Sequence, residues 1–113
     1  MNMVGFVGAI LLQAASPLSD ESGGMAAVQV AMDAWKICAA KQVRHYATTT
    51  REPAQTVVDA AIGSCSDEFV SVRNTLFEIK LTVKQTEELL DNLVATYRPK
   101  LVAGVLNLRQ PAN

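Results

Sequence analysis

The sequence predicts an all-α protein: a disulfide-linked antiparallel helical hairpin with a long second helix and a short C-terminal helical segment. Three observations lead to this prediction. Apolar side chains recur every three or four positions over most of the chain, as they do on one face of a helix. A polar stretch of threonines ending in a proline, residues 48–53, interrupts that pattern. Two cysteines, Cys38 and Cys65, lie on either side of this stretch, at nearly equal distances from its centre.

The composition fits one small domain and disfavours several classes of partner. Half of the 113 residues are apolar (50%), which is enough to form a buried core. The chain is too short to form two domains. The formal net charge is −1, and residues of both signs are mixed along the chain. Nucleic-acid binding is therefore not expected, because it normally requires a basic surface.

The first fifteen residues are expected to be a signal peptide. Met3 to Leu12 is an apolar run without charge, and the small residues Ala14, Ala15 and Ser16 follow it. The run is too short to cross a bilayer, which takes about 20 residues. Cleavage is expected after Ala15, which would give a periplasmic or secreted protein. Because no Lys or Arg precedes the run, an apolar helix packed in the core is the alternative.

Residues 16–24 are rich in Ser and Gly and contain a proline, so they are expected to form a flexible linker. A single helical domain, residues 25–109, should follow. Its first helix is expected over 25–47, where Val28, Ala31, Trp35 and Cys38 share one face. Thr48 to Pro53 should form the turn, with the next helix starting between Thr50 and Glu52.

The second helix carries the clearest periodicity in the chain. Its stripe resembles a coiled-coil seam with one polar member, Thr86, and comprises Val58, Ala61, Cys65, Phe69, Val72, Leu76, Ile79, Val83, Thr86, Leu90, Leu93 and Tyr97. An unbroken helix from Pro53 to Tyr97 would be about 65 Å long, roughly twice the length of the first helix. We therefore expect either a break near Gly63 to Asp67 or an overhang. Arg98-Pro99 should end or kink this helix, a short helix should cover 100–108, and 110–113 should be a disordered tail.

The two cysteines are most simply explained as one disulfide. Each lies on the apolar stripe of its helix, and in a hairpin they would reach similar heights, with Trp35 near Phe69. A disulfide closing this loop would stabilise the fold by about 3–4 kcal/mol. Two buried thiols or a redox pair remain as alternatives, although no CxxC spacing occurs. Two cysteines and one histidine are a poor zinc ligand set.

The Trp35-x-x-Cys38 pattern, a polar turn, and then Ala60-Ala61-x-x-x-Cys65 resemble short exported helical proteins of Gram-negative bacteria. This resemblance covers only the hairpin and implies no activity.

The sequence predicts no catalytic, cofactor-binding or metal-binding residues. His45 is the sole histidine, and neither a nucleophile elbow nor a phosphate-binding loop accompanies it. The acidic residues lack the spacing of a calcium loop and are expected to form a solvated face; they are Asp67, Glu68, Glu87, Glu88 and Asp91. An enzyme is therefore not expected.

One apolar surface is wider than a single seam and is the predicted interaction site. It comprises Leu89, Leu90, Leu93, Val94, Tyr97 and Leu101. The C-terminal segment, a second copy or another protein could cover it, whereas membrane contact is disfavoured by the scarcity of flanking lysines. The expected function is a small exported interaction module without enzymatic activity that binds a protein partner or self-associates. The alternative is a periplasmic chaperone-like or stress-response protein that exposes apolar helix surface.

Overall fold

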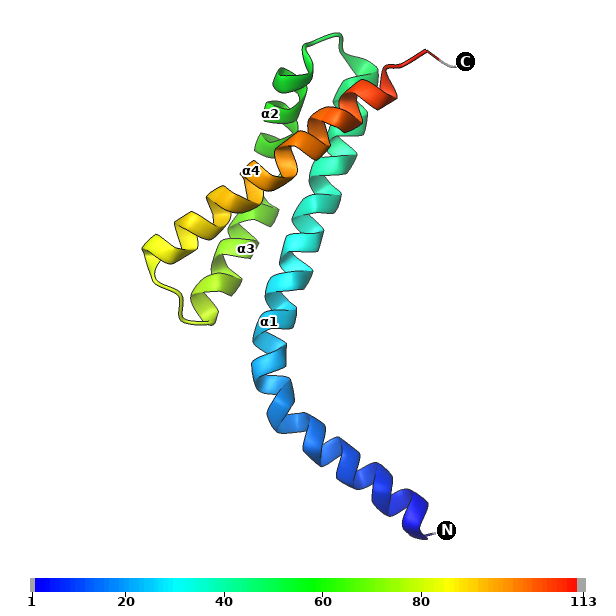
Figure 1. Ribbon diagram of the computed structural model, residues 1–113, viewed down its shortest axis with the longest axis vertical. Helices are drawn as coiled ribbons and strands as arrows, with labels where there is room; N and C mark the ends of the chain where they lie inside the picture. The colour runs from blue at the N-terminus through cyan, green and yellow to red at the C-terminus, as the bar shows by residue number, and fades with distance from the viewer. Residues whose placement is uncertain (1, 112–113) are drawn as a thin grey trace.

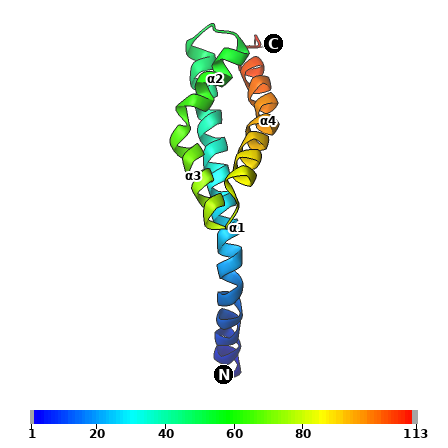
Figure 2. The same ribbon diagram turned by 90° about the vertical axis from the view of Figure 1, so that its left-hand side faces the viewer.

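The computed structural model describes the backbone of residues 2–111 and the side chains of residues 24–111. As predicted, this part of the chain is helical and contains no strand. Its four helices are α1 (Asn2–Thr49), α2 (Ala54–Ser64), α3 (Ser66–Glu78) and α4 (Val83–Leu108). The C-terminal half of α1 contacts all three other helices, and the N-terminal half projects away from them (Figure 1, Figure 2).

The first helix is continuous through residues 16–24, where the sequence predicted a flexible linker. Instead of breaking, α1 changes direction within its blue stretch in Figure 1, the stretch that contains Pro17 and the Gly23-Gly24 pair. Proline and paired small residues are the usual causes of such bends. The predicted signal peptide, residues 1–15, lies outside the residues whose side chains are described.

The polar turn after α1 is present, but its threonines do not cap the next helix. The hydroxyl groups of Thr48, Thr49 and Thr50 donate instead to carbonyls in the last turn of α1, at 2.7–2.8 Å. Pro53 is the N-cap residue of α2, so this helix begins later than the predicted start between Thr50 and Glu52. The backbone N–H that Pro53 lacks is not needed there, because the first N–H groups of a helix have no partner within the helix.

The predicted break near Gly63 to Asp67 is present at Cys65, which ends α2 and precedes α3. Cys65 is also bonded to Cys38 of α1, with the sulfur atoms 2.06 Å and the Cα atoms 6.0 Å apart. The predicted disulfide is therefore confirmed, and the alternatives with free thiols do not apply to this structure. Asp67 and Glu68 occupy the first turn of α3, where the helix dipole favours negative charge.

A second turn, over residues 79–82, was not predicted. The Leu81 N–H donates to the Leu76 carbonyl and the Lys80 N–H to the Phe77 carbonyl, the pairing of a Schellman motif. Lys80 adopts the left-handed conformation (φ 72°) that usually requires glycine. Thr82 and Gln85 then form a reciprocal capping box that starts α4.

The final helix, α4, continues through Pro99 instead of ending there. The prediction that the second helix reaches Tyr97, with or without a break near Gly63 to Asp67, and is followed by a separate short C-terminal helix is therefore wrong beyond Glu78. The chain turns at residues 79–82, and the long helix is α4 itself, which returns to the end of the molecule that holds the α1–α2 turn (Figure 1). Arg98 secures it there by donating to Gln55 at 3.2 Å and pairing with Asp59, both on α2.

The core has two halves that differ in side-chain size. The small-residue half, between α1, α2 and α4, comprises Ala39, Val43, Ala47, Val57, Val58, Ala61, Leu101 and Val105. The large-residue half, between α1, α3 and α4, comprises Val28, Ala31, Trp35, Cys65, Val72, Leu76, Leu90 and Leu93. Trp35 is fully buried in the second half, with its ring centroid 6.2 Å from that of Phe69, as predicted, and 5.7 Å from that of Tyr97.

Candidate functional site

The six predicted interaction residues lie along α4, but most of them face the core of their own chain. Leu90, Leu93 and Leu101 are buried, and Val94 and Tyr97 are half-buried. Only Leu89 is exposed, at 46%. The first helix of the same chain therefore covers most of this surface, and not the C-terminal segment, a second copy or another protein, which were the covers considered. The missed turn at 79–82 explains the difference, because it folds α4 back against α1.

The strongest candidate site is an apolar cavity in the large-residue half of the core. It has a volume of about 220 Å³ and lies between α1, α3, the 79–82 turn and α4. All ten lining residues are apolar: Met25, Val28, Met32, Val72, Leu76, Ile79, Leu81, Leu89, Leu90 and Leu93. A cavity with such walls stays dry or takes an apolar ligand, since no polar group is available to hold water.

The mouth of this cavity is formed by side chains that keep one side in solvent. Met25 is 61% and Leu89 46% exposed, so an apolar group can reach the interior between α1 and α4. Leu76 and Leu81, which are joined by the Leu81 N–H to Leu76 carbonyl hydrogen bond of the Schellman motif, also line the cavity. The turn that the sequence did not predict thus closes one end of the cavity.

A groove of about 270 Å³ between α1 and α4 adjoins the cavity. The two hollows share Met32, Leu89 and Leu93 as lining residues. Toward Tyr97 the groove becomes more polar, and its remaining lining residues are Lys36, Asn92, Thr96, Tyr97 and Lys100. The Lys36 ammonium nitrogen lies 5.8 Å from the centroid of the Tyr97 ring, within range of a cation–π contact.

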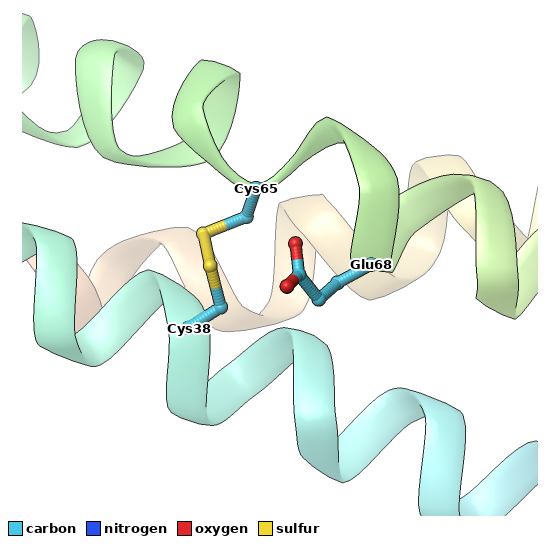
Figure 3. Close-up of side chains that lie close together, drawn as sticks. All are labelled: Cys38, Cys65 and Glu68. Atoms are coloured by element: carbon cyan, nitrogen blue, oxygen red, sulfur yellow. A yellow bond between two sulfur atoms is a disulfide. The ribbon is translucent and has the colours of Figure 1, made fainter.

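The disulfide has an acidic neighbour but does not form a metal centre. The Glu68 carboxylate lies beside Cys38 and Cys65 in Figure 3, and the three potential ligand atoms are within 4.8 Å of one another. Two sulfur atoms bonded to each other are not thiolates, however, and the thiolate is the form that binds metal ions. This cluster therefore joins α1 to the α2–α3 break without offering a coordination site.

The other residues considered for chemistry lie on the surface. His45 is exposed near the end of α1, and its ring stacks edge-on against Tyr46 at 5.3 Å between centroids. Asp67, Glu87, Glu88 and Asp91 are exposed, whereas Glu68 is half-buried. These positions match the solvated acidic face that the sequence indicated.

One structural residue was missed by sequence reasoning. The Arg109 guanidinium donates to the carbonyl oxygens of Ala47, Thr50 and Glu52, at 3.1, 3.0 and 2.6 Å. It thereby fixes the C-terminal end of α4 to the α1–α2 turn. No local signal identifies this role, because the contact depends on where α4 ends in space.

Comparison of the chain with protein-family models, with curated proteins and with solved structures gives no match. Among the residues that the structure describes, no helix is both long enough and apolar enough to span a membrane.

Proposed function

We propose that this chain is a small exported helical interaction module that acts without catalysis and receives an apolar group of its partner in the cavity. The observation that carries the proposal is the cavity wall. Ten apolar side chains from three helices and one turn converge there, and none of them can act as a nucleophile, general acid or general base. Binding would be driven by removing apolar surface from water.

The framework around the cavity supports a preformed site. The disulfide joins α1 to the α2–α3 break, the capping box fixes the start of α4, and Arg109 fixes its end. Walls held in this way need little ordering on binding, which favours affinity. We further propose that α1 and the α2–α3 pair form an antiparallel hairpin. Contacts of Trp35 with Phe69 and of Cys38 with Cys65 support this register.

Export is supported by two features of different origin. Met3 to Leu12 followed by Ala14-Ala15-Ser16 has the form of a signal peptide, and a disulfide persists in oxidising compartments. We propose a periplasmic or secreted mature chain that starts at Ser16. Intact-mass analysis of the exported protein tests this proposal, and a retained N-terminal segment would contradict it.

Self-association now depends on Leu89, the exposed member of the predicted interaction set. Light scattering tests it directly. A dimeric mass that Leu89→Asp returns to the monomeric mass supports self-association. A monomeric mass for the unaltered protein overturns it and leaves the cavity for another partner.

The cavity itself is tested with Nile red, a neutral dye that fluoresces in apolar sites. We expect one dye molecule to bind per chain, and Leu89→Trp to abolish binding by filling the mouth. Leu106→Trp is the matched control, since Leu106 is also exposed on α4 (54%) and does not line the cavity. Equal binding by the two variants, or no binding to the unaltered protein, would contradict the proposed function.

A further inference from the structure

The apolar cavity and the adjoining groove form one path with a change of character along it. Met32, Leu89 and Leu93 belong to both hollows, so a ligand can pass from one to the other without leaving the protein surface. The cavity end is entirely apolar. The groove end carries two cations, Lys36 of α1 and Lys100 of α4. Lys100 lies about 16 Å along α4 from Leu89.

The charge in the groove has one sign. None of the groove's lining residues is acidic. Neither Lys36 nor Lys100 has an ion-pair partner among residues 24–111. Glu88 lines a neighbouring hollow that shares Leu89 and Asn92 with the groove. Asp33 and Asp91, the acidic residues nearest in sequence to Lys36 and Lys100, are exposed and do not line the groove. An anionic group is thus complementary to the groove end, and a cationic group is not.

The size of the path fits a small molecule with a flexible chain. The cavity exceeds the roughly 150 Å³ at which engineered apolar cavities bind small hydrocarbons. Together the two hollows reach the range of about 300–1,000 Å³ that is typical of small-molecule sites. A continuous path with one apolar and one cationic end matches an alkyl chain that ends in an acid.

We propose that this path binds one free single-chain amphiphile with an anionic head, of the fatty-acid class. The alkyl chain occupies the cavity between Val72, Leu76 and Leu90, and the carboxylate lies between Lys36 and Lys100. This proposal rests on the proposed function, for which it names the ligand class. The affinity comes mainly from burial of the alkyl chain, because Lys100 is exposed and Lys36 is half-buried, and ion pairs at such positions contribute mainly to selection of the head group.

Calorimetric titration of the full chain below the micelle concentration tests the proposal with three probes that share a ten-carbon chain: decanoate, decyltrimethylammonium and decanol. We expect one decanoate per chain, bound about tenfold more tightly than decyltrimethylammonium. Affinity should rise about fourfold for each methylene added between octanoate and decanoate, which corresponds to about 0.8 kcal/mol. This chain-length series needs no variant and is therefore independent of folding defects.

Variants locate the two ends of the ligand. The double substitution Lys36→Gln/Lys100→Gln should weaken decanoate about tenfold and leave decanol unchanged. Lys41→Gln/Lys84→Gln is the control, because these exposed lysines of α1 and α4 lie outside the cavity and groove. Leu89→Trp should abolish binding of all three probes, and Leu106→Trp should not.

Each contrary result has a distinct meaning. Equal affinity for decanoate and decyltrimethylammonium overturns the assignment of the head group. Failure of all three alkyl probes in a protein that still binds Nile red overturns the amphiphile and leaves the proposed function standing. Failure of Nile red as well overturns both. Binding to phosphatidylglycerol vesicles without a saturable decanoate site also overturns the proposal, since it indicates a membrane surface as the ligand.

Discussion

The two halves of the core contrast in side-chain size and in what they leave open. In the small-residue half, Ala39, Ala47 and Ala61 let α1, α2 and α4 approach closely, and Arg109 closes the end. In the large-residue half, bulkier side chains of α1, α3 and α4 surround a cavity of about 220 Å³. The small-residue half is therefore closely packed, whereas the large-residue half retains space for a ligand.

The disulfide at the border between the halves should give the largest effect. Replacing both cysteines by alanine (Cys38→Ala/Cys65→Ala) is expected to lower the free energy of unfolding by about 3–4 kcal/mol. Urea denaturation monitored by far-ultraviolet circular dichroism measures this loss. A change below about 1 kcal/mol would show that helix packing alone holds the halves together.

The Arg109 clamp should give the next largest effect. Arg109→Met keeps much of the side-chain length but removes three hydrogen bonds to carbonyl oxygens, so we expect a loss of about 2 kcal/mol. Arg51→Met, at an exposed position in the same turn, is the matched control and should change stability by less than about 0.5 kcal/mol. Equal effects of the two substitutions in urea denaturation would show that the Arg109 hydrogen bonds do not stabilise the fold.

One added methylene should have opposite effects in the two halves. Val58 and Val72 are both buried, at 0% and 1% exposure, but only Val72 lines the cavity. Val58→Ile should destabilise by about 1–2 kcal/mol through overpacking. Val72→Ile should stabilise by up to about 0.8 kcal/mol because the methylene enters empty apolar space. Thermal or urea unfolding of the two variants measures both signs. The same sign at both positions would contradict the contrast between the halves.

The turn that closes the cavity should give the smallest effect. Lys80 has a positive φ, which costs about 1 kcal/mol for a residue with a Cβ, so Lys80→Gly should stabilise the fold by about that amount. Lys84→Gly, within α4, should instead destabilise by about 1 kcal/mol. Thermal unfolding of the two variants distinguishes them, and destabilisation by Lys80→Gly would argue against the Schellman turn.

The sequence was informative where a local pattern and a long-range constraint agreed. The stripes placed Cys38 against Cys65 and Trp35 against Phe69, and both contacts are present. The sequence did not reveal the turn at residues 79–82, because the apolar spacing continues across it. Lys80 also occupies the left-handed position at which glycine is the usual signal of a helix end. The Thr82-x-x-Gln85 capping box was the available signal for a new helix start.

The cavity could not be predicted, for a physical reason. Its volume is the space left between helices from three parts of the chain, and periodicity indicates which side chains face inward but not how closely they meet. Once the turn at 79–82 is missed, Leu90 and Leu93 are assigned to an open surface, whereas they form an inner wall. Three of the predicted interaction residues, Leu89, Leu90 and Leu93, therefore do line the candidate site, but the sequence pattern placed them on an outer surface.

Methyl NMR of the full chain during titration with decanoate tests the central claim most directly. The account predicts that methyl signals from the large-residue half shift with one-to-one saturation, those of Val28, Met32, Val72 and Leu89 among them. Signals of Val57, Val58 and Val105 in the small-residue half should stay in place. Shifts centred on the small-residue half, or spread evenly without saturation, would contradict the claim that the open half of this fold is its binding site.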